Sequence, residues 1–163
     1  MDDSICYTET ISSKQTEDLF IALTLIFGGL CTRRASKKGL DAFAFVFGGL
    51  CLAFLFYAMN YRVLTIRLTQ KALQLKFGMI NWTEPYENIA ACSIDDISGL
   101  MRYGGAGVHF MSIQNRYRAS FNFLEYSRVV VALKKKAGPV CDISFTTRNP
   151  EKVLQLIQRY AAL

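Results

Sequence analysis

Residues 42–59 read AFAFVFGGLCLAFLFYAM and contain no charged side chain. At about 1.5 Å per residue, a helix over this stretch covers roughly 27 Å, close to the roughly 30 Å thickness of the hydrocarbon core of a bilayer. A helix is the structure that satisfies all backbone hydrogen bonds of such a segment in lipid. The sequence therefore predicts a membrane-spanning helix within the apolar segment Leu40 to Asn60.

A shorter apolar segment, Leu19 to Thr32, precedes this stretch and would cover about 21 Å as a helix. By length alone it fits a span, a buried core helix, an interfacial helix or a signal h-region. A signal peptide is disfavoured because the tail over residues 1–18 is acidic and the exit is Arg33-Arg34. We therefore expect a transmembrane hairpin over residues 19–60, with one span plus an interfacial helix as the alternative.

The five residues FGGLC occur twice, at 27–31 and at 47–51. Pairs of glycines let a second helix backbone approach closely, so this small repeat predicts helix packing. The alternative is the ordinary glycine content of membrane helices. The candidate packing residues are Gly28, Gly29, Gly48 and Gly49.

Charge and cysteine content narrow the function classes. Residues 62–163 carry 14 Lys and Arg against 7 Asp and Glu, a net charge of +7. A basic domain beside a bilayer faces anionic headgroups, whereas no motif in the chain indicates nucleic-acid binding. The five cysteines are dispersed without a Cys-x-x-Cys pair, which predicts a reducing compartment and neither a disulfide scaffold nor a metal site.

From Tyr61 onward the hydrophobic period becomes strand-like. Residues 79–82 are interpreted as a connection, residues 98–107 as a glycine-rich loop and residues 134–139 as a polar turn. The seven expected strands cover residues 63–68, 72–77, 89–94, 108–113, 116–123, 128–133 and 140–145.

The end of the chain predicts an amphipathic helix. Asn149 suits the N-cap and Pro150 the first helical position, and Val153, Leu154 and Ile157 then fall on one face. The expected fold class is α+β: a two-helix hairpin, then a sandwich or barrel of about seven antiparallel strands over residues 61–163, capped by this helix.

Four stretches resemble the bacterial pleckstrin-homology-like (PH-like) domains that small membrane proteins carry behind a transmembrane hairpin. They are RLTQKALQLKFG at 67–78, EPYENI at 84–89, YGGAGV at 103–108 and ISFTTRNPE at 143–151. The sequence departs from the pattern at Ala106, where an aromatic residue is expected. The resemblance covers about residues 61–163 and implies a PH-like fold with the domain in the cytoplasm.

Local charge does not decide the topology. The positive-inside rule draws the basic loop 33–39 to the cytoplasm, but the basic residues that follow Tyr61 draw the domain there with similar strength. The resemblance and the dispersed thiols favour a cytoplasmic domain, in a multi-pass protein of the bacterial inner membrane.

Residues for enzyme chemistry are scarce. His109 is the only histidine, and it sits in a strand pattern between Val108 and Phe110. Neighbouring strand residues point to opposite faces, so Asp95 and Asp96 do not converge as an acid and base, and we interpret them as strand-end capping and solvated residues. The glycines at 104–107 lack the Gly-Lys-Ser/Thr ending of a phosphate loop. We expect no catalytic residues, no metal and no cofactor.

A basic constellation is the best candidate for binding phosphate or lipid headgroups. Its members are Arg116, Arg118, Arg128, Lys134, Lys135 and Lys136. The alternative is a solvated turn that protects strand edges. Candidate partner contacts in the glycine-rich loop are Met101, Arg102 and Tyr103.

Two function classes remain. The favoured one is a non-enzymatic membrane adaptor or accessory subunit that binds a membrane protein or forms a homo-oligomer. The alternative is a module that senses or handles anionic lipid headgroups, and a toxin-neutralising membrane protein is a further alternative because such a role leaves no chemical signature.

Overall fold

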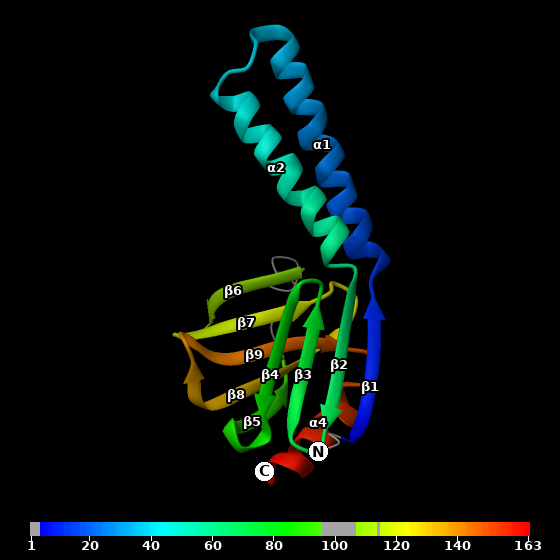
Figure 1. The fold of residues 1–163 in the computed structure, drawn as a ribbon, viewed down its shortest axis with the longest axis vertical. Coiled ribbons are helices and arrows are strands. Elements are labelled where there is room, and N and C mark those ends of the chain that lie inside the picture. The colour runs from blue at the N-terminus through cyan, green and yellow to red at the C-terminus, as the bar shows by residue number, and fades with distance from the viewer. Residues whose placement is uncertain (1–3, 96–106, 114) are drawn as a thin grey trace.

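In the computed structural model, two long apolar helices stand on one end of a β-rich domain (Figure 1). The structure describes residues 4–95, 107–113 and 115–163. Helix α1 covers Lys14–Lys38 and helix α2 covers Ala42–Asn60, and both are long and apolar enough to cross a membrane. Helix α1 thus extends the expected segment 19–32 by about one turn or more at each end.

Sheet A has four strands in the order β1-β2-β3-β4, all antiparallel. The strands are β1 (Ile5–Ser12), β2 (Val63–Thr69), β3 (Ala72–Phe77) and β4 (Ile80–Pro85). Strand β1 lies within residues 1–18, which were expected to form an acidic tail outside the domain. It pairs with β2 along its length, so the tail belongs to sheet A, and the α1–α2 hairpin connects two neighbouring strands (Figure 1).

Sheet B has five strands in the order β5-β8-β9-β7-β6. The strands are β5 (Ile89–Ile94), β6 (Gly107–Ile113), β7 (Arg116–Asn122), β8 (Ser127–Ala137) and β9 (Val140–Thr147). Strands β7 and β9 pair in parallel, which corrects the expectation of an all-antiparallel arrangement. Among the described residues no strand pairing joins the two sheets into a closed barrel, so the domain is a two-sheet, sandwich-like α+β structure.

Strand β4 replaces the connection that was expected at residues 79–82. Phe77 pairs with Ile80, which leaves Gly78 and Met79 as a two-residue turn. Gly78 has φ of 60°, the left-handed value that a tight hairpin turn asks of its first central residue. Gly78 therefore lies in the turn between β3 and β4, and the chain continues from the β2–β3 hairpin into a further strand.

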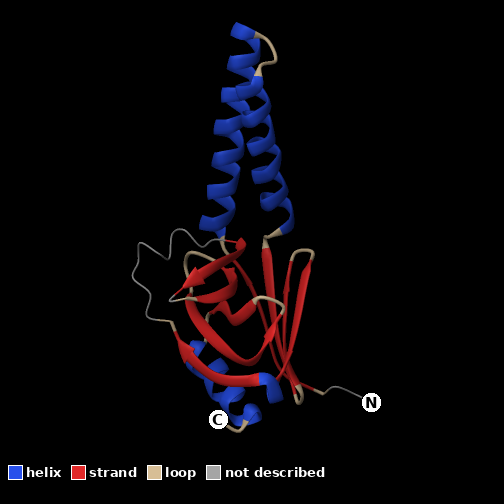
Figure 2. Cartoon of the chain, turned by 90° about the vertical axis from the view of Figure 1, so that its left-hand side faces the viewer, coloured by secondary structure: helices blue, strands red, loops and turns tan. Residues whose placement is uncertain are grey.

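Helix α4 (Pro150–Ala161) covers the end of the domain opposite α1 and α2 (Figure 2). A short 3₁₀ helix, η1 (Tyr86–Asn88), connects β4 to β5. Val153 and Ile157 are fully buried in the core between the sheets, as their spacing predicts. Leu154 is only half-buried, and Leu156 packs against the core in its place. The buried face of α4 is thus turned slightly from the expected one.

Candidate functional site

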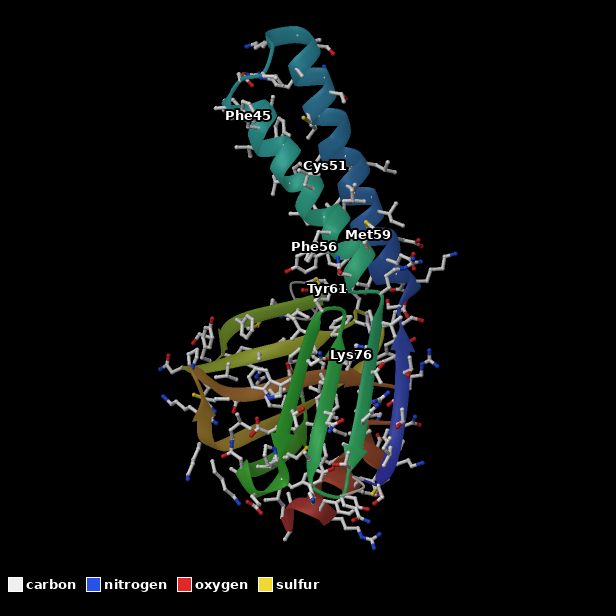
Figure 3. All side chains as sticks on the ribbon, in the orientation of Figure 1. Phe45, Cys51, Phe56, Met59, Tyr61 and Lys76 are labelled. Carbon is white, nitrogen blue, oxygen red and sulfur yellow. The ribbon has the colours of Figure 1, made fainter. Side chains whose placement is uncertain are left out.

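The base of the hairpin is joined to the domain core by a continuous row of aromatic rings. Successive ring centroids lie 5.4 Å apart from Phe20 to Tyr57, 4.9 Å from Tyr57 to Tyr61, 5.4 Å from Tyr61 to Phe77 and 5.0 Å from Phe77 to Phe123. Aromatic pairs at these separations add about 0.5–1.5 kcal/mol beyond their buried area. Figure 3 shows Tyr61 at the foot of α2, directly above sheet A. The row makes hairpin and domain one packed body.

Close backbone contacts reinforce this junction. A Cβ atom on Gly107 of β6 would lie 3.2 Å from the ring of Tyr57, and the Tyr57 hydroxyl donates to the carbonyl of Val108 over 3.3 Å. On the α1 side, the backbone N–H of Leu124 donates to the Thr16 hydroxyl over 3.3 Å. Helix α2 therefore contacts sheet B through β6, and α1 contacts the connection between β7 and β8.

The FGGLC repeat builds the helix–helix contact reciprocally. A Cβ on Gly28 would lie 3.4 Å from the sulfur of Cys51, and a Cβ on Gly48 would lie 3.5 Å from the sulfur of Cys31. The cysteine of each repeat thus sits over the glycine of the other. A Cβ added to the second glycine of each repeat, Gly29 or Gly49, would meet no atom within 4 Å.

The arginines of the predicted basic constellation lie in an ion-pair cluster on sheet B. The Arg116 guanidinium binds both carboxylate oxygens of Asp142, with contacts of 2.6–2.9 Å. Arg118 lies 3.3 Å from Asp95 and 3.9 Å from Asp142, and Arg128 Nε lies 3.6 Å from Asp95. The two carboxylates therefore bind together strands β5, β7, β8 and β9.

Burial removes Arg118 and Arg128 from any surface site. Their side chains are 11% and 6% exposed, and Asp95 is 8% exposed. This corrects two expectations: the arginines do not form one exposed face with the lysines, and Asp95 is not a solvated strand end. A buried ion pair loses much of its Coulombic gain to desolvation, but removing one partner costs about 3–5 kcal/mol. The cluster is structural, and only Arg116 reaches solvent.

The three lysines extend strand β8 beyond its expected end at residue 133, instead of forming a free turn. Lys134, Lys135 and Lys136 are all exposed. The backbone of Lys135 is bracketed by the Asn88 amide, with contacts of 2.8 Å and 3.0 Å. The lysines are thereby fixed beside η1.

A surface hollow of about 720 Å³ lies beside these lysines, between the β2–β3 turn, η1 and the end of α4. Tyr86 stacks on Tyr160 with ring centroids 5.5 Å apart, and Lys134 lines the rim. A second hollow of about 360 Å³ adjoins it and is lined by Pro85, Lys134 and Lys135 among others. We call this surface, with Lys134–Lys136, the distal face.

Burial of Tyr86 raises its phenol pKa, so this ring stays neutral in the floor of the distal face. Sequence reasoning found the lysines but not the hollow. The signal that could have found it is the EPYENI stretch, which supplies Pro85 and Tyr86.

Comparison with family models, curated proteins and solved structures gives no match. The function must therefore be argued from the geometry of this chain.

The predicted partner contacts Met101, Arg102 and Tyr103 lie outside the described residues. The departure from the PH-like pattern at Ala106 lies outside them as well.

The described residues do not assemble a nucleophile and base. Strand register places His109 opposite Ser120, but the Ser120 hydroxyl is fully buried and bonded to Ser144 at 2.9 Å. Burial and the nearby Arg128 charge lower the pKa of His109. No group of three or more His, Cys, Asp or Glu side chains in the described part of the chain is placed to hold a metal ion.

Proposed function

We propose that this chain is a non-enzymatic adaptor or accessory subunit of a membrane protein complex. The α1–α2 hairpin crosses the bacterial inner membrane twice, and the PH-like domain presents its distal face to a partner protein in the cytoplasm. The resemblance of residues 61–163 to PH-like domains and the five free cysteines support the fold family and the compartment.

The observation that carries the membrane part is the pairing of β1 with β2. These strands flank the hairpin in the chain and pair over Ile5–Ser12 and Val63–Thr69. Two strands can pair only on one side of a membrane, so either both helices cross or neither does. Because α2 is apolar along its exposed surface, this pairing favours two crossings over the alternative of one span plus an interfacial helix.

The strand order of sheet B sets how far the lysines lie from the bilayer. Strand β6 contacts the hairpin base through Val108, and β8 lies three strand positions farther along the sheet (Figure 1). At about 4.8 Å per strand, the part of β8 that pairs with β9 up to Ala132 lies roughly 14 Å from β6, and the lysines follow it in the chain. That distance exceeds the Debye length of about 8 Å at physiological salt, so their attraction to the adjacent leaflet is largely screened.

The chemistry of the distal face suits a protein partner with an acidic segment. Lys134 and Lys135 supply positive charge at the rim beside Glu87, while Tyr160 and Pro85 supply apolar surface in the hollows. An aromatic and apolar centre with a charged rim is the usual anatomy of a protein interface. The packed junction sets the position of this face relative to the hairpin, which is what an adaptor requires.

Site-specific photo-crosslinking tests the proposal on the full chain in cells. A photo-reactive residue at Lys135 should capture a discrete partner band after purification in mild detergent. The matched control is Lys76, an exposed lysine of β3 on the outer side of sheet A (Figure 3). A band of the same protein at both positions, or capture of lipid alone at Lys135, would refute a protein-binding distal face.

A crosslinked band of twice the chain's own mass would identify a second copy as the partner. With the photo-reactive residue kept at position 135, the proposal also predicts that Lys134→Glu with Lys136→Glu abolishes the band while leaving the protein in the membrane. Loss of membrane retention in this variant would show that the lysines act on the bilayer instead.

A further inference from the structure

The tip of the hairpin carries a basic hollow that the adaptor function does not use. The last turns of α1 place Leu30, Arg33, Arg34, Lys37 and Lys38 at intervals of three and four residues. This spacing puts all five side chains on one helix face. Phe47 of α2 closes the other side, and the six residues line a hollow of about 270 Å³.

One anion at the tip is already fully engaged. Asp41 accepts from Arg34 Nε at 2.8 Å and from Nη2 at 2.6 Å, and its other carboxylate oxygen accepts from the backbone N–H of Ala44 at 3.0 Å. Arg34 also lies over the ring of Phe43, 5.1 Å from its centroid. Asp41 therefore caps α2 and neutralises one cation only.

Arg33 and Lys37 are the cations at the tip without a carboxylate partner among the described residues. Within the part of the chain that the structure describes, neither Arg33 nor Lys37 makes a salt bridge, and both are exposed. Basic residues in a last helical turn are ordinarily explained by the helix dipole. That explanation accounts neither for the apolar wall nor for the hollow between two helices.

The position of the hollow along the hairpin corresponds to the edge of a bilayer. If Tyr57 and Tyr61 mark the interface on the domain side, α2 rises about 28 Å from there, roughly one hydrocarbon thickness. Leu30 and Phe47 then lie at the level of the upper acyl chains, and the cations of α1 lie one to two turns farther out. A ligand that fits carries a phosphate above and an apolar part below.

From these observations we propose that the hairpin tip binds the phosphate headgroup of an anionic phospholipid in the leaflet opposite the domain. Arg33 and Lys37 bind the phosphate, and Leu30 with Phe47 contacts the start of an acyl chain. Basic pockets between transmembrane helices are suited to such headgroups. The inference rests on the two membrane crossings of the proposed function, but not on the distal face.

Native mass spectrometry of the full chain in mild detergent provides the test. Phosphatidylglycerol, phosphatidylcholine and inorganic phosphate are titrated separately. The key variant is Arg33→Gln with Lys37→Gln, and the matched control is Lys134→Gln with Lys135→Gln, which removes the same charge at the other end of the molecule.

We expect saturable binding of phosphatidylglycerol to the wild type. Each removed charge should weaken it about fivefold, the equivalent of about 1 kcal/mol, so the tip variant should bind roughly 25-fold more weakly. The distal control should stay within about twofold. A Lys37→Arg variant keeps the charge and should bind like the wild type, which shows that the charge at this position, and not the lysine itself, is required.

Three results would overturn the inference: equal binding of phosphatidylcholine, equal loss in the distal control, or inorganic phosphate binding as tightly as the lipid. The last result would identify a free-anion site. Resistance to alkaline extraction from membranes separately tests whether the hairpin is inserted, and the crosslink at Lys135 tests the adaptor function. The lipid site at the tip and the adaptor function can therefore fail independently, whereas a hairpin that is not inserted would overturn the lipid site as well.

Discussion

Replacing Gly78 by alanine should uncouple the hairpin from sheet A. A Cβ at this position would lie 2.3 Å from the carbonyl oxygen and 3.0 Å from the carbonyl carbon of Asn60, the last residue of α2. Both are backbone atoms, so the contact is relieved only if the β3–β4 turn and the foot of α2 move apart. Alanine also pays about 1–2 kcal/mol for the left-handed φ of 60°.

Gly138 provides a matched control for this substitution. It has the same φ of 60° in the β8–β9 turn, but an added Cβ there meets no atom within 4 Å. Gly138→Ala should therefore cost only the conformational term of about 1–2 kcal/mol. Gly78→Ala should cost a further 1–3 kcal/mol or so, the usual range for overpacking.

Thermal unfolding in detergent, followed through the fluorescence of Trp82, measures both variants. Trp82 is the only tryptophan and lies in β4, with its ring 6.3 Å from that of Phe121 in sheet B. For a chain of this size about 1 kcal/mol lowers the melting temperature by about 2–4 °C. We expect Gly78→Ala to melt about 2–12 °C below Gly138→Ala. Equal melting temperatures would refute the tight junction at the foot of α2.

Three further predictions concern the domain itself. Ile157→Ala should cost about 2–5 kcal/mol in the free energy of unfolding because Ile157 is fully buried, whereas Leu154→Ala should cost clearly less, and equal losses would contradict the observed rotation of α4. Burial raises the pKa of the Cys92 thiol to about 12, so at pH 8 iodoacetamide should label the exposed Cys6 and spare Cys92 until denaturant is added, as peptide mass mapping will show. Because the pKa of His109 is lowered in the fold, the unfolded chain binds a proton at higher pH than the folded chain. The melting temperature should therefore fall as the pH drops from about 7.5 to 5.5. His109→Gln should lose this dependence, and an unchanged pH profile in the variant would contradict the prediction.

Local patterns in the sequence predict most of the secondary structure. The apolar run of α2, the alternating residues of β2 and β3, and the Asn149-Pro150 start of α4 each lead to the observed element. Such patterns report which face of an element is buried, and the burial of β2 and β3 follows their alternation. They report nothing about which elements come together.

What the sequence could not predict depends on pairing between distant segments. Strand β1 was not predicted because its alternation, with Ile11 buried and Ser12 exposed, occurs in a short polar stretch. Such a stretch is identified as a strand only by its pairing with β2. The cluster around Asp142 depends on the parallel register that sets Arg118 opposite Asp142. No local periodicity specifies that register, so the arginines appeared to be free for a ligand.

The position of β1 also decides where the chain can be divided. A fragment beginning at Tyr61 would expose the edge of β2, which β1 covers, and it would remove Glu9, which accepts from the backbone N–H of Arg148 at 2.9 Å at the junction of β9 and α4. The expected boundary between a tail over residues 1–18 and a domain over residues 61–163 therefore does not follow the fold. Sheet A contains β1, which precedes the hairpin in the chain, and β2, which follows it. The β-rich domain and the two apolar helices therefore form one structural unit. Under the proposed function, a partner bound at the distal face is therefore held at a distance from the bilayer that the chain itself sets.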